Sequence, residues 1–309
     1  MIFDKLVSVI IPTYSRADNL NKAIESVLKQ TYTNFEIIIV DDNGLGTPNQ
    51  LITQEQVSQF LQDERIKYVT RLTNGGGSEA RNTGIEESSG ELITFLDDDD
   101  VYLQDKISYQ VKIINSGYDI SLCSMLVKLS TGIILDPKWC YSKGDSIRDF
   151  VLHGNAFTPM IMLKRNLLGE NAKFIKVKML QDHIFILNVL KNNPNAKINS
   201  SEKKLFVHHI HDGERVSNNR DVDCYRFKNS LENEFIPYLD KKEVSYLKFK
   251  QSKEIAIVMS ECGDYVKSIC FLIKNCTMIS SFLFPKEYLK LILRIMVGRK
   301  IYHSLKRVL

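Results

Sequence analysis

The sequence has few of the features that mark a secreted, disulfide-linked or membrane-spanning protein. Its six cysteines form no C-x-x-C pair and no ordered spacing with histidine, so we expect them to be reduced and mostly buried. The chain enters a strand-like stretch within six residues, which leaves no room for a signal peptide. The most apolar long stretch, residues 268–284, is interrupted by Lys274 and Asn275 and is too short and polar to span a bilayer. These absences predict a cytoplasmic protein.

A net positive charge is found only at one end of the chain. The net charge is +4, but residues 286–309 hold seven Lys/Arg and one Glu, so this segment carries +6 and the remainder −2. A basic face over the whole fold, as nucleic-acid binding needs, is therefore not expected. The segment can form a helix with an apolar stripe bordered by basic residues, although Gly298 weakens it. We expect it either to lie on an anionic membrane surface or to pack on the rest of the protein.

The first third of the chain alternates strand-like and helix-like stretches. With 309 residues, 44% of them hydrophobic and 25% charged, the protein can bury a large core in one or two domains. The apolar spacing predicts strands at 6–11, 35–40, 66–69 and 92–96, with helices at about 20–28, 49–62 and 79–88. This order predicts a parallel sheet with right-handed crossovers.

Beyond residue 100 the pattern loosens, and no internal repeat occurs. A helix at about 103–114 is followed by predicted strands at 120–123, 127–135, 158–163 and 203–208. Another helix follows Gln181-Asp182-His183 and runs to Lys191, where Asn193-Pro194 ends it. From about residue 225 the chain reads as helical and increasingly basic.

Four consecutive acids, Asp97 to Asp100, follow the apolar stretch 92–96. The carboxyl ends of strands in open α/β sheets are where ligands bind. Four adjacent anions cannot all be buried and ionised, so a positive group is expected beside them, and a divalent metal is the simplest candidate. Oxygen ligands suit Mg²⁺, Mn²⁺ or Ca²⁺ better than zinc. The alternative is a solvated acidic turn. A P-loop ATPase is excluded because no G-x-x-x-x-G-K-[ST] precedes the acids.

Other candidate side chains follow the first two strands and the third helix-opening loop. Asp42 can accept a hydrogen bond from a ring N–H of a nucleobase, or it can form an Asx-turn with Asn43-Gly44. Thr13 and Tyr14 would line the same pocket. The loop Gly75-Gly76-Gly77 can approach a phosphate or serve as a flexible connection. Arg81 can pair with a diphosphate or with the acids.

Four segments, in order, resemble the motifs of family 2 glycosyltransferases with the A-type nucleotide-diphosphosugar transferase fold. They are residues 7–14 (VSVIIPTY), 39–42 (IVDD), 77–82 (GSEARN) and 95–100 (FLDDDD). This resemblance covers roughly the first 105 residues. Downstream, the family's acidic pair before an apolar helix appears only as Gln181-Asp182, and its histidine-containing segment appears as His208-His209-Ile210-His211.

The resemblance implies an α/β fold with a Rossmann-like, mostly parallel central sheet flanked by helices and followed by a C-terminal helical extension. Residues 1–224 would form the catalytic domain, with a nucleotide-sugar-binding half at 1–105 and an acceptor half at 106–224. Residues 225–309 would form the extension, ending in the basic tail 286–309.

The resemblance also assigns roles to individual residues. The donor side would be formed by Pro12, Thr13, Tyr14, Asp42, Arg81, Asp97 and Asp98. Asp99 and His211 would hold Mn²⁺ or Mg²⁺, while Asp100 can cap the next segment. Asp182 would be the general base of an inverting transfer, with Glu170 and His183 as competing candidates.

The implied reaction moves a sugar from a nucleotide-diphosphate sugar, with a UDP-sugar as first candidate, to a hydroxyl of a glycan or lipid-linked acceptor. A carboxylate that accepts from a ring N–H fits thymine or guanine as well as uracil. Cell-surface polysaccharide synthesis, such as that of capsule or O-antigen, is the setting that the resemblance implies, with the protein peripheral on the inner face of the plasma membrane. The open alternatives are a sugar-nucleotide pyrophosphorylase and a non-catalytic nucleotide-sugar-binding module.

Overall fold

The computed structural model describes residues 4–136, 146–210, 220–276, 291–292 and 295. The chain divides into two compact units, the first made of 1–177 with 181–213 and the second of 178–180 with 214–309. The division falls before helix α7 (Val222–Asn233), whereas the boundary predicted from the sequence follows residue 224. His211 and most of the basic tail 286–309 lie outside the described residues, so their predicted roles stay predictions.

The first unit is built on one sheet of nine strands among the described residues. The sheet order is β3-β2-β1-β4-β8-β6-β9-β5, and β7 pairs with β6. The four strands that the sequence predicts in the first third are parallel neighbours: β1 (Val7–Thr13), β2 (Phe35–Asp41), β3 (Ile66–Thr70) and β4 (Leu92–Phe95). The remaining strands are β5 (Val101–Tyr102), β6 (Ile120–Lys128), β7 (Ile134–Leu135), β8 (Ile161–Lys164) and β9 (Ile198–His209). The predicted A-type fold class is confirmed.

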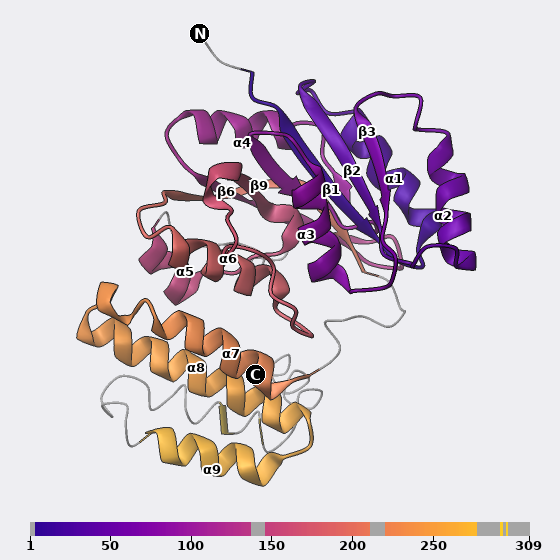
Figure 1. The fold of residues 1–309 in the computed structure, drawn as a ribbon. Coiled ribbons are helices and arrows are strands. Elements are labelled where there is room, and N and C mark those ends of the chain that lie inside the picture. Colours follow the sequence, from indigo (N-terminus) through magenta and orange to yellow (C-terminus); the bar gives the residue numbers. More distant parts are fainter. Residues whose placement is uncertain (1–3, 137–145, 211–219, 277–290, 293–294, 296–309) are drawn as a thin grey trace. The chain divides into compact units, whose positions relative to one another are not determined.

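Successive residues of β1 point to opposite faces of the sheet, and each face is covered by its own helices (Figure 1). Val9 belongs to the core that joins α1 (Ala17–Leu28), α2 (Pro48–Ser58) and α4 (Lys106–Asn115). The next residue, Ile10, lies against Gly84 of α3 (Gly77–Glu87), where an added Cβ would come within 2.3 Å of its Cγ2 atom. Only glycine allows this close approach of helix and strand.

The second face is completed by α5 (Ile147–His153) and α6 (Gln181–Asn192). Phe95 is opposite Ile10 in the β1–β4 register, and its ring meets Phe185 of α6 edge-on at 5.7 Å. Phe174 stacks on Phe185 with ring centroids 3.9 Å apart. This aromatic packing fixes the start of α6 beside the carboxyl end of β4.

Several predicted boundaries in the second half were wrong. The expected strands at 120–123 and 127–135 are the continuous β6 and the two-residue β7 across the turn at 130–132. The stretch 158–163 begins with a 3-10 helix, Thr158–Met160, before β8. Strand β8 runs antiparallel to β4 and β6, and β5 runs antiparallel to β9, so the sheet is less parallel than the alternation of early elements suggests. These strands pair over long sequence separations, which local patterns do not encode.

The second unit is helical in its described part, with α7, α8 (Lys241–Glu261) and α9 (Tyr265–Cys276). A capping box at Asp240 and Glu243 starts α8. The buried Glu232 of α7 pairs with Lys228 of its own helix and with Lys250 of α8 at 2.9 Å. Within the described residues, no helix is both long and apolar enough to cross a membrane.

Candidate active site

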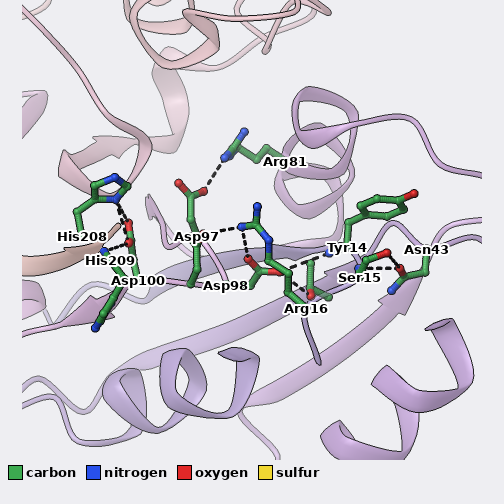
Figure 2. Close-up of polar contacts among 12 residues, drawn as sticks. Tyr14, Ser15, Arg16, Asn43, Arg81, Asp97, Asp98, Asp100, His208 and His209 are labelled. Atoms are coloured by element: carbon green, nitrogen blue, oxygen red, sulfur yellow. Dashed lines mark hydrogen bonds and ion pairs between the residues drawn. The ribbon is translucent and has the colours of Figure 1, made fainter. Parts of the chain in front are cut away.

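The acidic run lies where the carboxyl ends of β1, β2 and β4 come together (Figure 2). Strand β1 lies between β2 and β4, so the residue that ends β1 is next to the acids that follow β4. The Thr13 hydroxyl donates a hydrogen bond of 2.8 Å to Asp98. The backbone N–H of Tyr14 points to the same carboxylate oxygen at 3.4 Å. Thr13 and the acids, predicted separately, therefore meet in one site.

The four acids differ in exposure in an alternating pattern. The side chains of Asp97 and Asp99 are 30% and 15% exposed, while those of Asp98 and Asp100 are 7% and 1% exposed. Burial, together with the neighbouring Asp99 carboxylate, raises the pKa of Asp98 to about 7. Burial likewise raises the pKa of Asp100 to about 6. Asp97 and Asp99 are thus the acids that a ligand can reach.

Asp97 pairs with Arg81, which projects from α3 (Figure 2). The Arg81 Nη2 atom is 2.6 Å from Asp97, and its Nη1 atom donates to Gln181 at 3.2 Å. The guanidinium also lies over the ring of Phe174, 5.5 Å from its centroid. Burial by itself would lower the pKa of Arg81, but the carboxylates of Asp97 and Asp182 raise it. The sequence predicts that Arg81 pairs either with a diphosphate or with the acids, and in this structure it pairs with Asp97.

Asp98 and Asp99 share a second arginine that the sequence analysis missed. The Nη1 atom of Arg16 is 2.5 Å from Asp99 and 3.4 Å from Asp98. Arg16 occupies the N-cap position of α1, two residues after Tyr14 in the first motif. The signal that could have found it is its place in the loop that leaves the carboxyl end of β1, next to the acids of β4.

Asp100 is bound at the other end of the run. Its carboxylate lies 3.0 Å from Nδ1 of His208 and accepts a hydrogen bond of 3.0 Å from the backbone N–H of His209. Burial by itself would lower the pKa of His208, but the hydrogen bond and charge of Asp100 raise it. Asp100 therefore ties β4 to β9 instead of capping the segment that follows it.

Asp42 organises the glycine loop. Its carboxylate accepts hydrogen bonds from the backbone N–H groups of Gly75 and Gly76, at 2.9 and 2.7 Å, and faces Nε of Arg71 at 3.3 Å. The Asx-turn considered for Asp42 is made instead by Asp41, which accepts from the Asn43 backbone N–H at 2.8 Å. The loop N–H groups thus bind a protein carboxylate, and a nucleobase contact of Asp42 stays a prediction.

Asp182 is the second residue of α6 and lies close to Arg81. Thr158 of the 3-10 helix donates a short hydrogen bond to its carboxylate. Burial raises the pKa of Asp182, with Arg81 acting in the opposite direction. Of the competing candidates, His183 is buried with its ring stacked on Phe150 at 5.0 Å, and Glu170 is exposed. Asp182 is therefore the candidate base that is both near Arg81 and oriented by a neighbour.

A pocket of about 750 Å³ borders the acidic run on the side of α1. Its lining includes Asp99 and Asp100 of the acidic run and Lys22 and Lys29 of α1. Lys29 pairs with Glu25 at 2.8 Å. Asp99 thus borders this pocket and also pairs with Arg16.

The oxygen donors of the site fit a hard divalent cation. Among the described residues, no three His, Cys, Asp or Glu side chains converge to hold a metal by themselves. Mg²⁺ and Mn²⁺ in nucleotide sites often take one or two carboxylates and complete their coordination with phosphate oxygens and water. The reachable carboxylates of Asp97 and Asp99 match that smaller requirement.

The sheet has the fold of the A-type glycosyltransferases. A chain of Staphylococcus aureus TarS, residues 1–349 crystallised in complex with UDP-GlcNAc, has a similar fold, with a TM-score of 0.60, 20% identity, and coverage of 94% of this chain and 79% of that chain. The family model of glycosyl transferase family 2 matches residues 8–171. This match covers more than half of the chain, so the protein belongs to glycosyl transferase family 2.

Two relatives show how far the likeness extends. The Campylobacter jejuni GalNAc(5)-diNAcBac-PP-undecaprenol beta-1,3-glucosyltransferase is 26% identical over 87% of this chain and 82% of its own length. An uncharacterised glycosyltransferase of Rickettsia felis is 44% identical over 36% of this chain, and the match spans 18% of that relative. The first relative parallels most of the chain, while the second shares only one segment with it.

Proposed function

We propose that the protein is an inverting glycosyltransferase that moves a sugar from a nucleotide-diphosphate sugar to a hydroxyl of a lipid-linked saccharide. The observation that carries the proposal is the convergence, at one sheet edge, of the reachable Asp97 and Asp99 with Arg81 and the half-buried Asp182. Acids of this kind suit a donor diphosphate with its counter-ions, and a base nearby suits an acceptor hydroxyl. Family membership favours transfer over the pyrophosphorylase and binding-module alternatives.

The donor would lie along the carboxyl ends of β1, β2 and β4. Pro12, Thr13 and Tyr14 leave β1 at this edge, and the exposed Tyr14 ring can pack on the nucleoside. Asp42 would face the base, and Asp97 would face the ribose and diphosphate. The predicted donor contact of Asp98 would be indirect, because its buried carboxylate accepts from Thr13. The UDP-GlcNAc named for TarS supports a UDP-sugar as the first donor to test.

Asp182 would take the proton of the acceptor hydroxyl. As that proton moves to the carboxylate, the hydroxyl oxygen forms a bond to the anomeric carbon from the side opposite the leaving group, and the bond from that carbon to the diphosphate oxygen breaks. The Thr158 hydrogen bond holds the carboxylate in place, and burial makes it a stronger base than an exposed aspartate. Mn²⁺ or Mg²⁺, when bound at Asp99, would offset negative charge on the departing nucleoside diphosphate.

The acceptor proposal draws on the Campylobacter relative, whose name specifies a diphosphoundecaprenol-linked saccharide. A lipid-linked acceptor brings the reaction to a membrane surface, so we propose peripheral attachment and a part in cell-surface polysaccharide synthesis. The predicted contact of the basic tail 286–309 with anionic lipid is compatible with that setting.

Isothermal titration of UDP with and without Mn²⁺ tests the donor site. We expect UDP binding to depend on Mn²⁺ and to weaken at least about tenfold in Asp99→Ala. Replacing a residue that only hydrogen-bonds a metal ligand already lowers metal affinity about tenfold or more, and Asp99 would be a ligand itself. Asp105→Ala, which removes an exposed aspartate six residues along the chain, is the matched control and should bind UDP as the wild type does. Equal UDP affinity in EDTA and in Asp99→Ala would contradict the metal-dependent site.

A further inference from the structure

The two arginines of the site are held in different ways. Arg81 is 10% exposed and is fixed by Asp97, Gln181 and the ring of Phe174. The Arg16 side chain is 43% exposed. Among the described residues, its Nη1 atom alone makes polar contacts, so the rest of the fork is available to another partner. Arg81 is thus a fixed part of the site, while Arg16 can leave its carboxylates without disturbing the core.

The backbone that carries Arg16 is firmly placed. Ser15 adopts a left-handed conformation with φ of 54°, which is uncommon for a residue other than glycine. Its backbone N–H donates to the side-chain oxygen of Asn43 at 2.9 Å (Figure 2). The Asn49 side chain donates to the Ser15 hydroxyl at 2.9 Å. Asn43 is in turn held by Asp41 at 2.8 Å. The end of β2 therefore fixes the loop, and the freedom of Arg16 is confined to its side chain.

Arg16 and a divalent cation need the same carboxylate. The guanidinium lies 2.5 Å from the Asp99 oxygen Oδ2, and that carboxylate is the reachable oxygen donor at this end of the run. Two positive groups on one carboxylate repel each other, so a cation bound to Asp99 weakens the hold of that residue on Arg16. A guanidinium released there has a geometric match in the oxygens of a diphosphate, which it can bind with two hydrogen bonds.

We propose that Arg16 is an exchangeable counter-ion: it neutralises Asp98 and Asp99 in the free protein, gives Asp99 up to a divalent cation, and then binds the diphosphate of the donor. This inference rests on the proposed function of Asp99. Because the cation releases the arginine that the diphosphate binds, each ligand strengthens the binding of the other. Arg16 thus couples the binding of the two ligands and discourages the cation from binding alone.

Electron paramagnetic resonance of free Mn²⁺ gives the cation affinity directly, with and without UDP. In Arg16→Met without UDP, we expect Mn²⁺ to bind about tenfold more tightly than in the wild type, because a charge-assisted bond no longer opposes it. The same variant should bind UDP about tenfold more weakly in saturating Mn²⁺. Arg16→Lys keeps the charge without the fork, so it should restore the wild-type Mn²⁺ affinity but only part of the UDP affinity.

Lys22→Met is the matched control, since Lys22 is an exposed cation on α1 that lines the pocket beside Asp99. It should leave both affinities within about twofold if the effect is specific to Arg16 rather than to net charge. Circular dichroism melts establish that each variant is folded. If Arg16→Met binds Mn²⁺ no more tightly than the wild type, the proposed exchange of Arg16 for a cation is wrong, while the metal-dependent function still stands. A wild-type protein that binds UDP but takes up no Mn²⁺ in its presence would overturn the metal-dependent function itself.

Discussion

Asp97 and Asp99 differ from Asp98 and Asp100 although all four belong to one run of identical residues. The first two are partly exposed and face arginines from α3 and the β1–α1 loop. The other two are almost completely buried, and they bind Thr13 on one side and His208 with His209 on the other. The four acids form a tight turn after β4, in which the Asp100 backbone N–H donates to the Asp97 carbonyl at 3.0 Å, so one sequence motif supplies both a more exposed pair and a pair that holds the sheet edge together.

The largest expected effect lies on the ligand-facing side, at Asp182. Asn keeps the shape and the ability to accept from Thr158 but cannot take a proton. We expect Asp182→Asn to lower kcat by at least about 10²-fold, the usual loss for a general base, while nucleotide affinity and melting temperature stay close to wild type. Steady-state kinetics and thermal melts measure the two together. Near-normal turnover in Asp182→Asn would mean that another residue is the general base. A large drop in its melting temperature would indicate a structural role for Asp182.

Replacing a buried acid should lower stability rather than turnover, and the effect should be largest at Asp100. Replacing it with Ala removes the acceptor of the His209 backbone N–H and the partner of His208. Because buried groups left without partners cost about 1–3 kcal/mol each, we expect Asp100→Ala to lower the free energy of unfolding by about 3 kcal/mol. Urea unfolding measures it, with the exposed Asp105→Ala as control. A stable Asp100→Ala with a selective loss of nucleotide binding would erase the distinction between the two pairs.

The smallest expected effect is the pH dependence at Asp98, whose pKa burial and the Asp99 carboxylate raise to about 7. A raised pKa means that the folded protein holds the proton more tightly than the unfolded chain, so this contribution to stability is full below about pH 4 and is lost as the pH rises through about 7. Asp98→Asn cannot ionise. It should match wild type near pH 4 and be more stable by about 1 kcal/mol at pH 8, because the lost Arg16 pair offsets part of the gain.

Thermal melts in EDTA from pH 4 to pH 8 check this expectation, since EDTA keeps added cations from neutralising the site. The Asp105→Ala control should follow the wild-type curve at every pH. A stability difference between Asp98→Asn and wild type that does not change with pH would show that Asp98 is ionised throughout and belongs with the ligand-facing acids.

The nucleotide-binding third of the fold was predictable because its signals are local. Each of the parallel strands β1 to β4 is a short apolar run that ends at a turn, and the predicted ranges overlap the observed ones closely. The second half was harder because β6, β8 and β9 gain their order from pairing with distant strands, and β9 begins in the polar stretch 198–203 where no strand pattern is visible. The sequence also predicts a strand from residue 158, but Thr158 begins a 3-10 helix. The Thr158 side chain donates a hydrogen bond to Asp182, a contact that no local pattern indicates.

The sequence by itself determined the family motifs, the position of the acids after a buried strand, and the need for positive charge beside them. All of these follow from consecutive residues and from the repulsion of adjacent anions. The tertiary structure alone decided which acids are reachable and which cations face them. Arg16 meets Asp98 across 82 residues of sequence, and His208 meets Asp100 across 108. Such pairs form because parallel strands bring their carboxyl ends to one edge, and that arrangement depends on the strand order of the sheet rather than on any local pattern.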